Sequence, residues 1–239
     1  MRWLPLESNP EVMNQWSSAL GLSTDSVSFT DIYGLDEELL AMIPTPVFAV
    51  VMLFPITEEY ENFRAEENSR VLKEREQKEP EELKRQDESV MFIKQTISNA
   101  CGTMGLLHAL ANNPSLPLAP GPLKSLIEKF QGKTPLERAK MIEEDLALEE
   151  VHTRIARSGQ SRVPGLEEEL NLHFVCFIKS PVSNHLIELD GRKEFPIEHG
   201  NIEGDLLQAV VPVVRRFMNL AKDDVQFNLI ALCPTLCQP

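Results

Sequence analysis

The sequence predicts an α/β (α+β) protein in which a central sheet is flanked by helices. Segment 47–56 is almost continuously apolar, which is typical of a strand buried on both faces. Short strand-like runs recur towards the C-terminus, and helical runs precede and follow them. At 239 residues the chain is long enough for one domain with a substantial core. We therefore expect a single domain over 1–239.

The N-terminal part begins with a helix start signal. Asn9 can cap a helix that has Pro10 at its first position, and Gly21 should stop it. After the buried strand, segment 58–88 is rich in charged residues and poor in large apolar ones. This composition predicts a solvated helix that breaks near Pro80 into a mobile linker, and we assign it no chemistry.

The middle of the chain is expected to be helical. The run GTMGLLHALAN after Cys101 is apolar almost all round, which predicts a core helix. A short amphipathic helix should follow over 123–130. Thr134 and Glu137 have the spacing of a capping box, which should open a helix ending near Leu148. Residues 150–168 lack apolar periodicity, so we expect a long loop, and such loops are usually functional or disordered.

The C-terminal part alternates strands and a helix. Residues 172–178 and 185–189 are predicted to be paired strands, and 225–232 the last strand. Between them, 205–220 is an amphipathic helix that Pro212 should kink.

Composition restricts the possible partners and cofactors. The net charge is 23 − 37 = −14, which argues against nucleic acid or an anionic membrane as partner and mildly favours a basic one. The sequence has no secretory signal and no membrane-spanning run, so we expect a cytoplasmic protein with reduced thiols. No Cys/His cluster has zinc-ligand spacing and no Gly-rich phosphate loop occurs, so neither a metal nor a cofactor is expected.

The most informative stretch is KQTISNACGTMG, residues 94–105. Cys101 lies where a polar turn gives way to the apolar helical run, and a helix N-terminus stabilises a thiolate. Gln95, upstream, could donate its side-chain amide to an oxyanion. Because a lone cysteine is more often a buried structural thiol, the interpretation depends on its partners.

Candidate partners lie downstream, on the two predicted paired strands. His173 and His185 compete for the role of base, and Asp190 ends the second strand. His185 is closer to Asp190, although residues five apart on one strand project to opposite faces. Cys, His and Asp in this order, preceded by Gln, are typical of a cysteine hydrolase with nucleophile, base, orienting acid and oxyanion donor.

Several separate motifs resemble those of the ubiquitin carboxyl-terminal hydrolases. They are NACGT around Cys101, LHF around His173, ELDGR around Asp190, and the segments RWLPLESNPEV, FTDIYG and MLFPIT. The resemblance covers essentially the whole chain and is to the short cytosolic members. It implies that Cys101 is the nucleophile, His173 the base and Asp190 its orienting acid, with Gln95 as oxyanion donor.

The same resemblance implies the fold and the activity. The fold would be the papain-like α–β–α arrangement with an antiparallel sheet and a knotted backbone. The activity would be that of a deubiquitinating thiol protease, an omega peptidase of the ubiquitin-dependent catabolic pathway. It would act as a monomer without a cofactor and remove small adducts or short peptides from the C-terminal glycine of ubiquitin, with a close ubiquitin-like protein as a second candidate substrate. The alternative is a ubiquitin-binding protein with little turnover.

The resemblance also implies substrate contacts. Residues 150–168 would form a crossover loop draped over the cleft. Glu7, Glu11 and Asp31 would hold the basic tail of ubiquitin, and Leu6 would contact its hydrophobic face. Glu11 is also favoured in the first turn of a helix for purely structural reasons. Asp31 has no such explanation, because it interrupts a locally apolar segment.

Overall fold

The computed structural model describes residues 1–162, 164, 168, 170–222 and 224–236. Within this part of the chain, one six-stranded antiparallel sheet has the order β1-β6-β2-β3-β4-β5. The strands are β1 (Val27–Asp31), β2 (Ala49–Pro55), β3 (Leu172–Lys179), β4 (His185–Leu189), β5 (Ile197–Asn201) and β6 (Asn228–Pro234). The predicted central antiparallel sheet is therefore confirmed.

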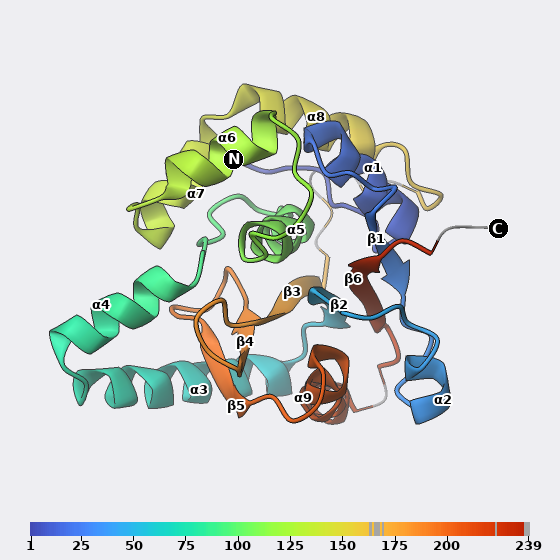
Figure 1. Cartoon of the computed structure of the whole chain (residues 1–239). Helices are drawn as coiled ribbons and strands as arrows, with labels where there is room; N and C mark the ends of the chain where they lie inside the picture. Colours follow the sequence, from blue (N-terminus) through green and yellow to red (C-terminus); the bar gives the residue numbers. More distant parts are fainter. Residues whose placement is uncertain (163, 165–167, 169, 223, 237–239) are drawn as a thin grey trace.

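Helices cover both faces of this sheet, which gives the predicted α–β–α arrangement. On one face lie α1 and α5 to α8, and on the other lie α3 and α9 (Figure 1). The helices are α1 (Pro10–Leu20), α2 (Glu37–Leu40), α3 (Glu58–Glu76), α4 (Pro80–Ser89), α5 (Cys101–Ala111), α6 (Pro122–Phe130), α7 (Pro135–Glu143), α8 (Leu146–Ala156) and α9 (Leu206–Ala221).

Strand β2 shows why its sequence is apolar throughout. Side chains alternate across a strand, so Val51 enters the core beneath α1 and α5 to α8, while Val50 and Met52 enter the core beneath α9. Both faces of β2 are therefore covered. Neighbouring β3 places Phe174 in the first core and Val175 in the second.

The local signals at helix ends are confirmed. Asn9 accepts a hydrogen bond from the Glu11 backbone N–H, and Gly21 ends α1 with a left-handed backbone (φ 116°). The capping box of Thr134 and Glu137 opens α7. Helix α5 is buried along nearly its whole length.

Several boundaries differ from the expectation. The linker expected after Pro80 is wrong, because the chain forms α4 there. Helix α7 ends at Glu143, and Asp145 caps a separate helix, α8. Since α8 continues to Ala156, the predicted loop over 150–168 begins seven residues later than expected. Residues 163 and 165–167 of that loop lie outside the described residues.

Strands β1 and β5 and the short helix α2 were not predicted. Two further observations concern the described residues. None of their helices is both long enough and apolar enough to cross a membrane. They also contain no group of three or more His, Cys, Asp or Glu side chains that could hold a metal ion.

Candidate active site

Cys101 is the first residue of α5. The turn before it includes Asn99 in a left-handed conformation (φ 63°), which asparagine tolerates well, and no side chain caps the helix. The first-turn N–H groups therefore remain available to stabilise a thiolate, and that of Gly102 contributes to the lowered pKa of Cys101. Glycine at 102 also allows close packing, since a Cβ there would lie 3.0 Å from Cβ of Leu6.

The predicted base, His173, and its predicted orienting acid, Asp190, come from neighbouring strands. His173 lies on β3 and pairs across the ladder with Phe54 of β2, while Asp190 follows β4 directly. His173 Nε2 lies 2.6 Å from Asp190 Oδ1, and the two side chains are 3% and 0% exposed. Because Asp190 engages Nε2, Nδ1 is the nitrogen available to the thiol.

Electrostatics favour a charged pair at this site. Burial opposes protonation of His173, but the charge on Asp190 and its hydrogen bond raise the pKa of His173 to about 9. Burial likewise disfavours the thiolate, yet the hydrogen bond and charge of His173 and the backbone N–H groups of Phe174 and Gly102 lower the pKa of Cys101. The arrangement therefore favours thiolate and imidazolium together.

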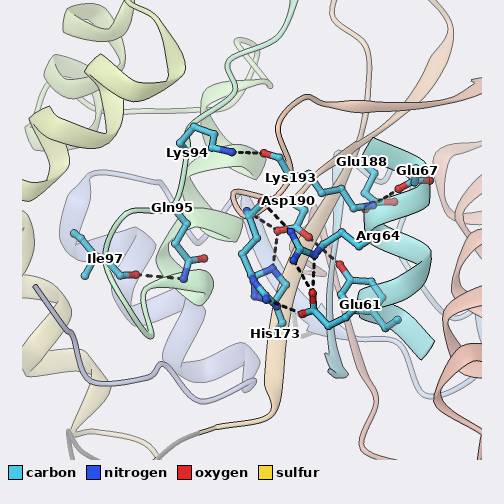
Figure 2. A network of polar contacts seen from close by, with 12 residues as sticks. Glu61, Arg64, Glu67, Lys94, Gln95, Ile97, His173, Glu188, Asp190 and Lys193 are labelled. Atoms are coloured by element: carbon cyan, nitrogen blue, oxygen red, sulfur yellow. Dashed lines mark hydrogen bonds and ion pairs between the residues drawn. The ribbon is translucent and has the colours of Figure 1, made fainter. Parts of the chain in front are cut away.

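Gln95 lies on the segment beside the Asp190 turn. Its backbone N–H donates to the Gly191 carbonyl over 2.9 Å. The contact is tight, because a Cβ at residue 191 would lie 2.9 Å from Cβ of Gln95. The Gln95 side-chain amide donates to the Ile97 carbonyl over 3.2 Å, and its buried Oε1 has no hydrogen-bond partner (Figure 2). The role of Gln95 as oxyanion donor stays a prediction.

Sequence reasoning missed the residues that surround Asp190. The Tyr60 hydroxyl, from α3, donates to Asp190 Oδ2 over 3.0 Å, and the Arg192 backbone N–H donates to Oδ1 over 2.8 Å. The charged composition of segment 58–88 concealed this contact. The one available signal was Phe63 three residues after Tyr60, because apolar side chains at that spacing share a helix face.

A second buried polar cluster supports the turn after Asp190. The Lys193 ammonium lies 2.5 Å from Glu67 of α3 and 2.5 Å from Glu188 of β4 (Figure 2). Glu188 also contacts His199 at 2.9 Å. Burial opposes ionisation of Glu188, but the charge of Lys193 lowers the Glu188 pKa, so this pair stays charged. The cluster ties α3 to the strand that leads to Asp190.

The other histidines lie outside the triad. His185 is 39% exposed and forms an ion pair with Glu198 at 2.7 Å. His108 and His152 are fully buried. Geometry therefore favours His173 over His185 as the base.

A cleft of about 450 Å³ opens beside Cys101. Its wall includes Leu6, Glu7, Ser161 and Arg162, so the N-terminal segment and the start of the 157–171 loop line it. Glu7 accepts a hydrogen bond from the Ser161 backbone N–H over 2.9 Å. Leu6 is only 4% exposed, so most of its surface is already used by the core.

The two other predicted substrate contacts lie away from this cleft. Asp31, at the end of β1, lines a neighbouring hollow of about 580 Å³, and the two spaces share Phe227 and Asn228 in their walls. Glu11 is exposed in the first turn of α1 and lines neither space. The substrate roles of all four residues stay predictions.

Comparison with known protein families identifies the chain's relatives. The family model for ubiquitin carboxyl-terminal hydrolase, family 1, matches residues 3–219. The chain belongs to this family. Ubiquitin carboxyl-terminal hydrolase 3 of Arabidopsis thaliana is 42% identical over 237 residues, which are 97% of this chain and 94% of that protein. The human ubiquitin carboxyl-terminal hydrolase isozyme L1 is 40% identical over 238 residues, 98% and 99% of the two chains.

A solved structure has the same fold. The catalytic domain of Trichinella spiralis UCH37, bound to ubiquitin vinyl methyl ester, matches with a TM-score of 0.74 at 22% identity. The match covers 99% of this chain and 97% of that domain. The papain-like α–β–α arrangement is thus that of a family whose motifs the sequence carries around Cys101, His173 and Asp190.

Proposed function

We propose that this protein is a cysteine hydrolase that cleaves bonds at the C-terminal glycine of ubiquitin, releasing small adducts or short peptides. The observation that carries the proposal is that Cys101 lies beside a cleft with its pKa lowered by His173, which is itself hydrogen-bonded to Asp190. Family membership supports ubiquitin as the substrate. In this role the protein is a ubiquitinyl hydrolase of the omega-peptidase class.

The reaction would proceed through a thioester. The Cys101 thiolate attacks the carbonyl carbon of the terminal glycine and forms a tetrahedral oxyanion. Collapse of this intermediate breaks the bond to the leaving amine, which takes the proton from the His173 imidazolium. His173, now neutral, deprotonates a water that attacks the thioester, and Cys101 leaves as thiolate while the carboxylate product forms. Asp190 keeps the proton on Nε2 and orients the ring throughout.

The oxyanion needs donors that are already in place. The backbone N–H of Cys101, at the N-terminus of α5, is one proposed donor, since helix N-termini favour negative charge. The Gln95 side-chain amide is the other. Its present acceptor is the Ile97 carbonyl, so substrate binding would exchange that bond for one to the oxyanion.

The substrate tail would lie in the cleft beneath the 157–171 loop. Ubiquitin ends in a basic, extended tail, and Arg–carboxylate pairs both attract and orient. Glu7 is the proposed carboxylate inside the cleft, and Asp31 and Glu11 are proposed contacts further out. A loop over the tail would admit small adducts and exclude folded ones. We further propose that the protein is monomeric and cytoplasmic, and that a close ubiquitin-like protein is a second substrate.

The alternative function is that of a ubiquitin-binding protein with little turnover. A ubiquitin-binding protein with little turnover would use the same cleft, because binding does not require that Gln95 and the triad reach their reactive geometry. The intact set of Cys101, His173, Asp190 and Gln95 favours the hydrolase.

One experiment separates the two functions. Ubiquitin carrying a fluorogenic C-terminal amide is incubated with the native protein and with Cys101→Ala, and both turnover and binding are measured. We expect turnover by the native protein only and comparable binding by both, since chemistry and binding use different contacts. Tight binding without turnover by the native protein would establish the binding protein instead.

A further inference from the structure

The second carboxylate oxygen of Asp190 has its own donor. Oδ1 of Asp190 accepts from His173 Nε2 over 2.6 Å and from the Arg192 backbone N–H over 2.8 Å. Oδ2 faces α3 instead and accepts from the Tyr60 hydroxyl over 3.0 Å. Asp190 is completely buried, so this oxygen cannot exchange Tyr60 for bulk water.

The Tyr60 ring is held rigidly. It contacts the ring of Phe54 at a centroid distance of 4.7 Å and that of Phe217 at 5.6 Å. Phe54 in turn meets the His173 imidazole edge-on at 5.8 Å. Phe54 therefore contacts both the ring that carries the Asp190-bound hydroxyl and the imidazole of His173.

Helix α3 is anchored to the Asp190 turn at several points along one face. Thr57 caps the helix by accepting the Tyr60 backbone N–H over 3.1 Å. Glu61, one residue after Tyr60, forms an ion pair with Arg192 at 2.7 Å, and Glu67 reaches Lys193 (Figure 2). These contacts fix the position of Tyr60 relative to the residues that follow Asp190.

We infer that Tyr60 is a positioning residue of the triad: its hydroxyl holds Oδ2 of Asp190 so that Oδ1 stays aligned with His173 Nε2. A carboxylate bound through one oxygen can rotate about its Cβ–Cγ bond, whereas one bound through both cannot. Burial, followed by the charges of Asp190 and Glu188, raises the Tyr60 pKa well above its ordinary value. The hydroxyl thus remains a donor at any working pH. This inference rests on the proposed hydrolase function.

The test is a double-mutant cycle on turnover of the fluorogenic ubiquitin amide. Tyr60→Phe removes only the hydroxyl, and Asp190→Ala removes its acceptor. In the native background Tyr60→Phe should lower kcat roughly tenfold, because a hydrogen bond to a charged group is worth a rate change of that size. KM should change by less than about twofold, since the hydroxyl touches no substrate. In the Asp190→Ala background the same change should alter kcat by less than about twofold.

Phe130→Leu is the control for lost packing. Phe130 is fully buried in the core on the opposite face of the sheet from Tyr60, so this change should lower thermal stability and leave kcat within about twofold of native. If Tyr60→Phe lowers stability as Phe130→Leu does but leaves kcat unchanged, the hydroxyl is structural and the inference is wrong. Equal losses of kcat from Tyr60→Phe in both backgrounds would overturn it as well.

A second measurement does not depend on turnover. The proton in the short His173–Asp190 hydrogen bond should give a low-field proton resonance in the native protein and in Phe130→Leu. In Tyr60→Phe it should move upfield or broaden, because the carboxylate is no longer aligned. An unchanged resonance in Tyr60→Phe would overturn the inference. An inactive native protein would refute the proposed function alone, and this resonance would then decide the inference.

Discussion

At the scale of single residues, the negative charge of Asp190 affects the pKa of both other members of the proposed triad. Asp190 makes His173 basic, and His173 makes Cys101 acidic. The raised pKa of His173, about 9, means that the imidazolium persists through neutral pH and is lost only as the pH rises through that value. In the proposed mechanism the leaving amine takes this proton. The alkaline side of the activity profile should therefore report His173.

Asp190→Asn should move this alkaline limb. The native profile of kcat/KM is expected to fall near pH 9, and the variant's limb should shift to lower pH by roughly 1 to 2 units, because the charge that stabilises the imidazolium is gone. Activity itself should fall about a hundredfold or more, since Asn also misorients the ring. His185→Ala is the control and should keep the native limb. A limb that stays near pH 9 in Asp190→Asn would assign the titration to another group.

A charge reversal at Asp31 tests whether this residue contacts the basic tail of ubiquitin. Reversing its charge, Asp31→Arg, should raise KM for the ubiquitin amide by roughly threefold to tenfold at low salt and leave kcat nearly unchanged. Added salt should weaken native binding more than the variant's. Asp25→Arg, at an exposed turn outside both hollows, makes the same change in net charge. An equal rise in KM for both variants would indicate a general charge effect, not a contact.

At the scale of elements, helix α8 and the loop after it connect the core to the cleft. His152 of α8 contacts Thr103 of α5 at 2.7 Å and the Leu4 carbonyl at 2.6 Å. The loop therefore departs from a helix that is anchored to both the nucleophile helix and the N-terminal segment. Glu7 holds the loop again at Ser161. These two attachments support the proposed role of the loop as a size filter.

Lengthening the loop tests the filter. A Gly/Ser insert near Gly159 should allow cleavage of folded ubiquitin dimers and leave hydrolysis of the small amide largely intact, because the added length widens the passage. The same insert between Val182 and Ser183, in the exposed turn between β3 and β4, is the control. Dimer cleavage that stays at the control's level, with the small amide still hydrolysed, would count against a filter.

At the scale of the whole molecule, two buried neutral histidines form hydrogen bonds between segments that are far apart in the sequence. His108 accepts the Ile93 backbone N–H over 3.0 Å and so links α5 to the segment that carries Gln95. His152 links α8, α5 and the N-terminal segment. Burial lowers the pKa of each to about 4. Both must take up protons when the chain unfolds in mild acid.

This predicts a loss of stability in mild acid. A histidine whose pKa is about 4 when folded and about 6.5 when unfolded stabilises the fold above pH 6.5 and loses that contribution as the pH falls towards 4. Between pH 7 and pH 5 the expected loss in unfolding free energy is roughly 2 kcal/mol per histidine. His173 has the opposite and smaller effect. Because its pKa is raised to about 9 in the folded protein, its contribution to stability increases slightly as the pH falls. Urea unfolding at the two pH values measures the loss, and His152→Gln should remove about half of it. An unchanged dependence in that variant would contradict the assignment.

The sequence by itself determined the local features and indicated the candidate triad. Asn9 and Thr134 cap helices through contacts a few residues away, and the apolar run of β2 requires cover on both faces wherever it lies. The motifs around Cys101, His173 and Asp190 together indicated a cysteine hydrolase, through their resemblance to a known family.

Only the tertiary structure decided what surrounds Asp190. Tyr60 lies 130 positions away in the chain, and Lys193 pairs with Glu67 across a similar separation. Charged residues on a helix predict a solvated face unless a partner from elsewhere neutralises them, and periodicity carries no information about such a partner. From the sequence, segment 58–88 was therefore assigned no chemistry, although Tyr60 of α3 holds the carboxylate of Asp190. A charged or polar side chain loses its hydration only when folding brings a distant partner beside it, and a local sequence pattern contains no information about that partner.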